Sequence, residues 1–317
     1  MRIRFSLIFA SVLLLASACK ADPEINYVWN GNKNQDEEPV TGDGKTLLAG
    51  SFNIRYYNTT DAYPWSVRKE PVMKFINTVE PDFLGVQELR STQSQDFSAM
   101  LSDKYGFYDI DRDSGKSVST GSGEGVGILY KKGRFKLEDK GFFWLAENPD
   151  KLPEKNDDGT FSSWHSAKRR VVLWVKLTDK LHNNQTVWFF ATHFDHISSE
   201  AREKSSTLTI SKIKEITGVS DLAKSGTPVF LVADFNCKLE STELGPIRST
   251  MNDARTMSKK TENGITYNGF GQGAGSVIDH IFYVGNINAD TYHVVTENYG
   301  VKYLSDHYPI TFNCSYK

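Results

Sequence analysis

The sequence is short of cysteine, has no excess of one charge and carries no second long apolar run. Only 3 of the 317 residues are cysteine, so at most one intramolecular disulfide can form. The 37 basic and 39 acidic residues give a formal net charge of -2, which argues against a protein that coats nucleic acid, because such proteins carry a clear basic excess. After the first 18 residues no apolar run has membrane length. The 39% hydrophobic and 12% aromatic content indicates a packed globular domain.

The amino terminus has the pattern of an export signal. Arg2 and Arg4 precede an apolar run over residues 5–16, and small residues follow up to Cys19. A positive start, a short apolar stretch and a small-residue cleavage site are typical of a secretory signal peptide. We therefore predict a signal peptide over residues 1–18.

Residues 16–19, Ala-Ser-Ala-Cys, resemble a bacterial lipobox, in which the cysteine is lipidated and becomes the mature N-terminus. Leu15 lies four positions before Cys19 where the lipobox prefers three, so ordinary secretion with an incidental cysteine is the alternative. Residues 19–45 are polar and Gly-containing, which predicts a flexible tether. We expect an exported, monomeric lipoprotein of the bacterial cell envelope, on the outer membrane or cell surface, that binds the membrane through a lipidated Cys19.

Two cysteines remain in the mature chain, Cys237 and Cys314. Their pairing geometry cannot be read from sequence. We interpret both as buried packing residues, with a disulfide between them as the less favoured alternative.

Short apolar segments alternate with amphipathic ones from Leu47 onward. Continuous apolar runs predict strands covered on both faces, at Leu47–Phe52, Phe83–Gln87, Val126–Tyr130, Val171–Leu177, Val187–Thr192, Val229–Ala233, Ile278–Val284 and Tyr308–Phe312. Helical periodicity predicts two helices, over about residues 68–79 and 199–217. Strands with helices between them, in one unbroken stretch, favour a single α/β domain over residues 46–317.

Six polar clusters follow or interrupt these predicted strands. They are Ser51–Arg55, Gln87-Glu88, Thr192–His196, Asp234–Asn236, Asp279-His280 and Ser305–His307. Each cluster alone fits a turn, a cap or a solvated side chain. The ends of strands, however, bring distant sequence positions to a common sheet edge. Carboxylates, amides and histidines gathered there are what magnesium-assisted phosphate chemistry needs.

The ordered series Ser-Phe-Asn-Ile-Arg, Gln-Glu, Thr-His-Phe-Asp-His, Ala-Asp-Phe-Asn, Ile-Asp-His-Ile-Phe and Ser-Asp-His-Tyr-Pro resembles the endonuclease/exonuclease/phosphatase superfamily, which has the deoxyribonuclease-I-like fold. The resemblance extends from Leu47 to Phe312, and it is closest to bacterial lipoprotein members related to the deadenylase-like branch. It implies a four-layered α/β sandwich, in which two packed mixed β-sheets are flanked by helices.

The resemblance also implies a bound Mg²⁺ ion, with Mn²⁺ as an alternative. Glu88 matches the glutamate that binds the catalytic ion, Asn53 the amide beside it, and Asp306 a metal-linked or orienting aspartate. Mg²⁺ needs few protein carboxylates because it keeps several waters and takes phosphate oxygens directly. A Zn²⁺ site built from histidines is the alternative, but carboxylate and amide ligands suit Mg²⁺ or Mn²⁺ better.

Five residues match the catalytic groups of the superfamily. By the resemblance, Asp234 positions or deprotonates the attacking water, Asn236 orients the phosphate, and His307 contacts the scissile phosphate with Asp279 as its carboxylate partner. An adjacent carboxylate favours the imidazolium form, so we expect His307 to stabilise negative charge in the transition state. His193 resembles the second histidine of the deoxyribonuclease and sphingomyelinase branches.

Arg170, Tyr56 and Asp195 are predicted to contact the substrate, together with Asn236. A guanidinium binds phosphate with paired donors, although a strand-edge salt bridge fits Arg170 equally well. The ring of Tyr56 suits stacking on a base or sugar, with core packing as the alternative. Asp195 is singled out because it lies two residues after His193.

The predicted function is hydrolysis of phosphate esters by in-line attack of water, without a covalent intermediate. A phosphodiesterase or nuclease is the leading prediction, and a phosphatase or phospholipase C-like hydrolase of inositol phosphates or sphingomyelin-type lipids is the alternative. The balanced charge slightly disfavours long polyanions. Arg55-Tyr56 stand where abasic-site endonucleases carry an acidic residue, which argues against DNA repair. The alternative of another class is a catalytically inactive surface binding protein, which we disfavour because Glu88, the Asp-x-Asn pair and His307 are all present.

Overall fold

The computed structural model describes residues 43–262 and 264–317. The predicted signal peptide, Cys19 and nearly all of the predicted tether lie outside the described residues. Among the helices of the described ranges, none combines the length and the apolar character that crossing a bilayer would require.

Two mixed β-sheets form the centre of the described chain. The first has the strand order β10-β12-β13-β1-β2-β4-β3 and the second β5-β6-β7-β8-β11-β9. The strands of the first sheet are β1 (Thr46–Asn53), β2 (Phe83–Leu89), β3 (Tyr105–Asp111), β4 (Gly125–Lys131), β10 (Lys260–Thr261), β12 (Ile287–Val294) and β13 (Ile310–Tyr316). Those of the second are β5 (Phe135–Trp144), β6 (Val171–Asp179), β7 (Gln185–His193), β8 (Val229–Asp234), β9 (Asn252–Asp253) and β11 (Asp279–Val284).

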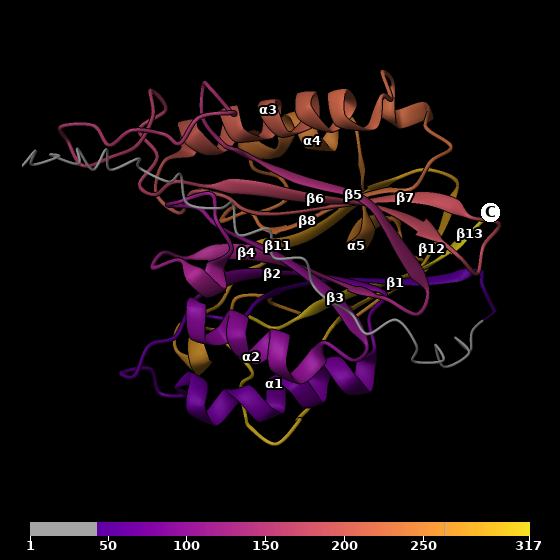
Figure 1. Cartoon of the computed structure of the whole chain (residues 1–317), viewed down its shortest axis with the longest axis horizontal. Coiled ribbons are helices and arrows are strands. Elements are labelled where there is room, and N and C mark those ends of the chain that lie inside the picture. The colour runs from indigo at the N-terminus through magenta and orange to yellow at the C-terminus, as the bar shows by residue number, and fades with distance from the viewer. Residues whose placement is uncertain (1–42, 263) are drawn as a thin grey trace, which may run out of the picture. The chain divides into compact units, whose positions relative to one another are not determined.

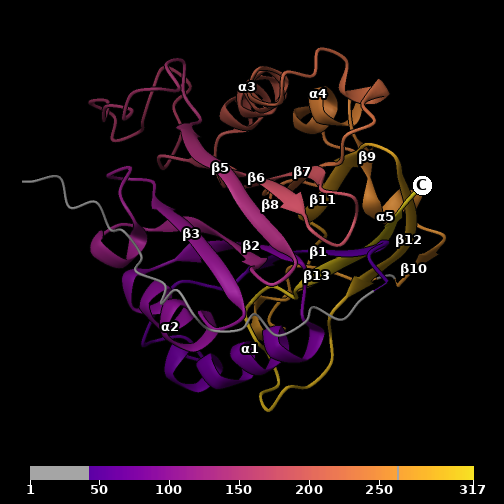
Figure 2. The same ribbon diagram turned by 45° about the vertical axis from the view of Figure 1, so that its right-hand side comes forward.

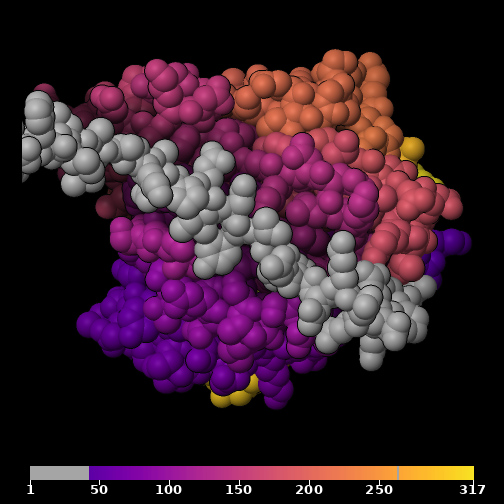
Figure 3. Space-filling model, in the orientation of Figure 1, coloured from indigo at the N-terminus to yellow at the C-terminus, as the bar shows by residue number. Residues whose placement is uncertain are grey.

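Helices cover the outer face of each sheet. The helices are α1 (Trp65–Val79), α2 (Ser91–Leu101), α3 (Ser199–Thr217), α4 (Gly245–Arg248) and α5 (Ala254–Met257). In Figure 1 the pair α1 and α2 lies below the first sheet, and α3 and α4 lie above the second; Figure 2 shows the same order of layers after rotation. Figure 3 shows the same two helical layers with all atoms drawn, in indigo to magenta below and orange above. The four-layered α/β sandwich expected from the resemblance is confirmed.

The inner faces of the two sheets pack on each other through aromatic side chains. The ring of Phe83 in β2 lies 5.1 Å from that of Phe189 in β7 and 5.5 Å from that of Phe230 in β8. The sheets approach each other closely at Gly85, where a Cβ atom would lie 2.4 Å from Val232 Cγ2. No side chain fits at this position, so glycine is required where β2 crosses β8.

Each sheet contains one β-α-β unit with parallel strands. In the first sheet β1 pairs with β2 after α1, and in the second β7 pairs with β8 after α3. Ser198 starts α3 by accepting a hydrogen bond from Ala201 N, and Gly218 ends it at φ +71°, which glycine adopts without steric cost. Because the strands of each unit run in the same direction, their carboxyl ends lie at one sheet edge, and there they carry four of the six polar clusters.

The eight predicted strands and both predicted helices exist, with ends shifted by a few residues at most. The strands β3, β5, β9, β10 and β12 and the helices α2, α4 and α5 were not predicted. Most of β5 between its ends is exposed or half-buried, and α2 consists largely of Ser, Gln and other polar residues, so neither shows an apolar run. Cys237 and Cys314 are both free and buried, which confirms their assignment as packing residues.

Candidate active site

The site forms where the carboxyl ends of β1, β2, β7 and β8 meet the start of β11 and the loop before β13. Asn53 lies at its centre and is fully buried. Its Nδ2 donates to Glu88 Oε1 at 3.0 Å and to Asp234 Oδ2 at 2.9 Å, and it lies 3.4 Å from His307 Nε2. Its Oδ1 accepts from Arg55 N at 3.0 Å. The Asn53 amide therefore joins side chains from both sheets. Asp234, one of them, lies 181 residues away in the sequence.

Glu88 is held in a backbone conformation that orients its carboxylate into the site. Its φ is +60°, and the pairing of β2 with β4 shifts register between Val86 and Leu89. A bulge of this kind redirects a side chain at the end of a strand, and left-handed backbone at a non-glycine residue costs free energy that the surrounding contacts must offset. The second oxygen of the carboxylate, Oε2, accepts from Tyr56 N at 3.1 Å. Both oxygens are thus fixed in place.

Two overlapping groups of side chains in the site could hold a metal ion. Glu88, His193 and Asp234 form one group, and Asp234, Asp279 and His307 the other; within each, one ligand atom per residue lies within 4.8 Å of the others. The first group offers two carboxylates, the hard donors that Mg²⁺ and Mn²⁺ prefer, and Glu88 is the only member of the two groups that is not buried. The residues therefore fit a divalent ion at Glu88 and Asp234.

The other two predicted ligands are placed differently. Asn53 turns its Nδ2 toward Glu88 and Asp234, so it acts in this arrangement as a hydrogen-bond donor. Asp306 lies outside both groups: Ser305 Oγ donates to its Oδ1 at 3.1 Å, and its Oδ2 is 3.8 Å from Arg55 Nη1. Metal ligation by these two residues stays a prediction.

His307 and Asp279 form the predicted pair. His307 Nδ1 lies 2.9 Å from Asp279 Oδ2, and both residues are buried. Burial alone lowers the pKa of His307, but the charges of Asp279 and Asp234 outweigh it and raise the pKa to about 10. His307 is therefore an imidazolium at neutral pH, as the sequence predicts. Its Nε2 faces Asp234 Oδ2 at 3.7 Å.

Asp234 is buried between the two histidines. Its Oδ1 accepts from Asn236 N at 2.9 Å, while its Oδ2 lies 3.7 Å from His307 Nε2 and 3.4 Å from His193 Nε2. Burial and the negative charge of Asp279 raise its pKa to about 7. A carboxylate with a pKa near the working pH is suited to take up a proton.

His193 occupies the opposite side of Asp234 and carries no charge. Asn236 Nδ2 lies 3.0 Å from His193 Nε2 and 3.1 Å from Phe194 O, so the amide donates to both and the histidine hydrogen sits on Nδ1. Burial and the positive charges of Arg170 and Arg112 hold the pKa of His193 well below its usual range. Asn236 itself has φ +53°, which turns its side chain back toward β7.

Two residues that the sequence did not single out stand behind His193. Glu124, directly before β4, lies 4.0 Å from His193 Nδ1 and forms a buried ion pair with Arg112 after β3. Both line a small cavity of about 10 Å³, together with Arg170, which is room for one water molecule. Glu124 comes at the end of a Gly-rich loop with no apolar strand before it, so the strand-end signal that found the other clusters did not apply.

Arg170 is buried with unused hydrogen-bonding capacity. Its Nε and Nη1 have no hydrogen-bond partner, and Nη2 lies 3.2 Å from His196 Nδ1. Its nearest carboxylate is Asp195, at 3.9 Å. Burial and the nearby Arg112 charge lower the pKa of Arg170 to about 10, so it stays cationic at neutral pH.

Asp195 and Tyr56 have local structural contacts. The carboxylate of Asp195 accepts from Ile197 N, Ser198 N and Ser166 Oγ at 2.8 to 3.0 Å, and these bonds fix the loop after β7. The ring of Tyr56 lies 4.2 Å from the Arg55 guanidinium. Substrate contact by Asp195 or Tyr56 stays a prediction.

Arg68 in α1 joins the two loops that border Asn53 and His307. It is fully buried and donates to four backbone carbonyls: Nη1 to Ile54 and Leu304 at 2.6 and 2.9 Å, Nε to Tyr63 at 2.6 Å, and Nη2 to Arg55 at 3.2 Å. Charge-assisted bonds of this kind are stronger than neutral ones. Arg68 thus holds the loop after β1 against the loop before β13.

Comparison with known proteins places this arrangement in one family. The model of the endonuclease/exonuclease/phosphatase family matches residues 50–307. An endonuclease/exonuclease/phosphatase structure from Bacteroides vulgatus is 32% identical, with a TM-score of 0.74 over 86% of this chain and 99% of that one. A mannosyl-6-phosphatase from Bacteroides thetaiotaomicron is 27% identical, with a TM-score of 0.74 over 84% and 99%.

More distant matches extend the comparison. The catalytic domain of human Nocturnin is 18% identical with a TM-score of 0.65, over 86% of this chain and 94% of that one, and it shares the fold. An uncharacterised protein of Acanthamoeba polyphaga mimivirus is 26% identical over 51% of this chain, and the match spans only 26% of that longer protein. With the match of the family model to most of the sequence, these findings show that the chain belongs to the endonuclease/exonuclease/phosphatase family, whose members are hydrolases of phosphate esters and generally use a divalent metal ion.

Proposed function

We propose that the chain hydrolyses phosphate esters by in-line attack of water, with a Mg²⁺ or Mn²⁺ ion held by Glu88 and with Asp234 as the proton acceptor. The observation that carries this proposal is the placement of the buried carboxylate of Asp234 3.7 Å from Nε2 of His307, whose Nδ1 is held by Asp279. A proton acceptor and a fixed positive charge on one small site are what water attack on phosphorus requires. When bound, the metal ion would polarise a phosphoryl oxygen.

The side chains take separate roles in this mechanism. Asp234 accepts the proton of the attacking water through the oxygen that faces both histidines. His307 donates from Nε2 to a phosphoryl oxygen and offsets the negative charge that develops there, while Asp279 holds its Nδ1–H. Asn236 holds the ring of His193 in place by donating to its Nε2, so that an uncharged imidazole borders Asp234 on the side opposite His307. No side chain is required as a nucleophile, so no phospho-enzyme forms.

Among phosphate esters we place phosphate monoesters of sugars first. A monoester carries about one more negative charge than a diester near neutral pH, and Arg170 offers a buried cation with two unpaired nitrogens beside the site. The catalytic groups Asn53, Asp234 and His307 are at most 4% exposed, which suits a small terminal phosphate better than a long polymer. The Bacteroides thetaiotaomicron relative, 27% identical over nearly its whole length, is a mannosyl-6-phosphatase, which supports the same choice.

Phosphodiester cleavage, including nuclease activity, is the second candidate. Tyr57 and Tyr267 are the aromatic residues that favour it, with exposures of 44% and 36%. Tyr57 lies near the site because the backbone N–H of the preceding residue, Tyr56, donates to the Glu88 carboxylate. The ring of Tyr267 lies 5.1 Å from that of His307. Exposed rings in such positions can stack on a base.

Turnover of matched substrates tests the proposal. The mature protein, freed of metal with EDTA and reloaded with Mg²⁺ or Mn²⁺, is assayed on mannose 6-phosphate, inositol phosphates, sphingomyelin, bis-p-nitrophenyl phosphate, RNA and DNA. We expect metal-dependent release of inorganic phosphate from the sugar phosphate, and its loss in Glu88→Gln. Activity that survives EDTA, or that is unchanged in a folded Glu88→Gln variant, would contradict the proposed mechanism; faster cleavage of diesters would favour the second candidate.

We also propose that the protein acts outside the cytoplasm, tethered by a lipid on Cys19. The support is the sequence pattern of residues 1–19. Expression of the full chain with radiolabelled palmitate and fractionation of the envelope test this, with Cys19→Ser as the variant. Equal membrane recovery of both forms, without label on either, would contradict it.

A further inference from the structure

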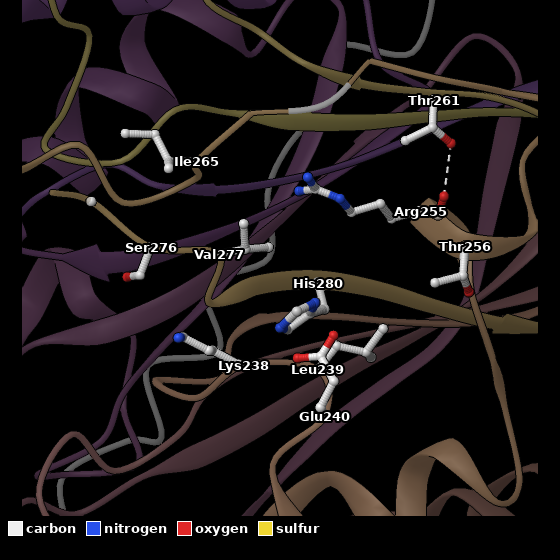
Figure 4. Close-up of a pocket in the computed structure, with 11 residues that line it drawn as sticks. Lys238, Leu239, Glu240, Arg255, Thr256, Thr261, Ile265, Ser276, Val277 and His280 are labelled. Carbon is white, nitrogen blue, oxygen red and sulfur yellow. Dashed lines mark hydrogen bonds between the residues drawn. The ribbon is translucent and has the colours of Figure 1, made fainter.

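A second cavity lies on the far side of β11 from the catalytic groups. Asp279 and His280 are consecutive in β11, and side chains alternate across a strand, so Asp279 faces His307 while His280 lines the cavity (Figure 4). The cavity has a volume of about 550 Å³, within the range of small-molecule sites. Its walls come from the loop after β8, from α5, from β10 and from the segment before β11.

Two buried acceptors beside this cavity have no hydrogen donor. His280 Nε2 lies 3.1 Å from Cys237 O; because a carbonyl only accepts, Nε2 carries the hydrogen, which leaves Nδ1 of the neutral ring as an acceptor. Neither His280 Nδ1 nor Asp253 Oδ2 has a partner, and the two atoms are 3.9 Å apart. His280 is 1% exposed and Asp253 7%. Buried acceptors that face each other destabilise the site until a donor lies between them.

The rest of the wall mixes donors, one acceptor and apolar surface. Lys238 and Glu240 come from the loop after β8, and Arg255 from α5; Arg255 is fixed by a bond from Nη1 to Gly264 O at 3.0 Å. In Figure 4 Arg255 and Lys238 lie on opposite sides of the cavity, with His280 between them and Val277 close by. The lining carries two cationic side chains, Lys238 and Arg255, and one anionic side chain, Glu240, so hydrogen-bonding groups of both kinds face the cavity.

We propose that this cavity binds a saccharide unit. Sugar hydroxyls both donate and accept, so one hydroxyl can donate to His280 Nδ1 while its neighbours accept from Lys238 and Arg255. The apolar side chains of the wall, Val277 among them, suit the C–H faces of a pyranose ring. A purely anionic ligand would leave the acceptors of His280 and Asp253 without a donor.

The cavity and the catalytic site share one segment of chain. Residues 265–277 form a hairpin whose base lines the cavity through Ser276 and Val277, while Tyr267 of the same hairpin packs its ring against His307. The backbones of Tyr267 and Ser276 pair with each other. The bound sugar would therefore lie one hairpin away from the site of hydrolysis, either as part of the phosphorylated substrate or as a separate glycan.

Binding of unphosphorylated sugars to the mature protein in EDTA tests the proposal independently of catalysis. The probes are methyl α-mannoside, mannobiose, methyl β-galactoside and N-acetylglucosamine, observed by saturation-transfer NMR and titration up to 20 mM. We expect at least one to bind, with affinity reduced at least tenfold in Lys238→Met and lost in Val277→Trp, which fills the cavity. Lys74→Met and Val67→Trp, both exposed on α1, are the matched controls and should bind as the unmodified protein does.

The arms of the experiment separate the outcomes. Binding by none of the probes, or binding unchanged in both cavity variants, would overturn the proposal, and so would binding lost in Asp234→Asn, because the sugar would then occupy the catalytic site. Failure of the catalytic proposal leaves these readouts unchanged. If the bound sugar is part of the substrate, saturating free sugar should raise KM for the sugar phosphate without changing kcat; if it is a separate glycan, neither value should change.

Discussion

The two histidines of the active site are alike in burial and opposite in charge. His307 touches Asp279 at 2.9 Å and is an imidazolium, whereas His193 is surrounded by Arg112 and Arg170 and is neutral. Each faces the same oxygen of Asp234, at 3.7 and 3.4 Å. The difference teaches that the charged neighbours of each ring, Asp279 beside His307 and the two arginines near His193, decide whether the imidazole is charged.

Replacing Asp234 should have the largest effect, because it removes the group that both histidines face. We expect Asp234→Asn to lower kcat by roughly 10³-fold, within the range for a lost general base, with KM changed little. Steady-state kinetics on the preferred substrate measure this, and thermal unfolding verifies that the variant is folded. A variant that keeps more than a tenth of the activity would remove Asp234 from the proposed role.

Exchanging each histidine for glutamine tests the comparison directly. His307→Gln loses a charged donor and should cost roughly 10²-fold in kcat, whereas His193→Gln loses a neutral hydrogen bond and should cost about tenfold. The measurement is kcat/KM for both variants in the same buffer. Equal losses would mean that the charge difference between the two rings has no catalytic consequence.

Asp279→Asn should shift His307 toward the neutral form in which His193 is held. The pKa of His307 is lowered by burial and raised to about 10 chiefly by Asp279, so the charged form persists through the neutral range. Without that carboxylate the pKa of His307 falls, so the imidazolium loses its proton at a lower pH than in the unmodified protein. We expect the alkaline limb of the kcat/KM profile, measured from pH 6 to 10, to move to lower pH; an unmoved limb would show that another group controls it.

Glu124→Gln should have the smallest effect, because Glu124 lies 4.0 Å from His193 and is already paired with Arg112. We expect a loss of activity of about threefold, the equivalent of a weakened hydrogen bond, and an alkaline limb that stays where it is. If the alkaline limb moved as far as it does in Asp279→Asn, Glu124 would control the pH profile as strongly as Asp279, and the contrast between the two histidines would fail.

The sequence predicts those elements whose local signals, such as apolar runs and helix-capping residues, agree with the fold. The helix predicted over 199–217 has the observed bounds because Ser198 and Gly218 mark its two ends. The helix α2 and the strand β5 carry no apolar run, so only their tertiary contacts define them. The pairing of β1 with β13 joins positions more than 250 residues apart, so no local sequence pattern predicts it.

The candidate site divides in the same way. The residues that follow strands, such as Glu88 and Asp234, were found by their position, and the charge of His307 followed from the carboxylate implied beside it. The neutrality of His193 depends on Arg112 and Arg170, and their convergence with Glu124 is visible only after folding. The direction in which Asn53 presents its amide is likewise a property of the folded site.

The position of β1 between β2 and β13 has a consequence for the time at which the enzyme becomes competent. Strand β1, near the start of the domain, is completed on one side by the last strand of the chain, and His307 lies only three residues before that strand. Until β13 pairs with β1, the first sheet therefore lacks the neighbour of its central strand, and the loop that carries His307 has no fixed place beside Asn53. Assembly of the candidate site is in this way coupled to the closure of the first sheet, because a single long-range strand pairing completes both.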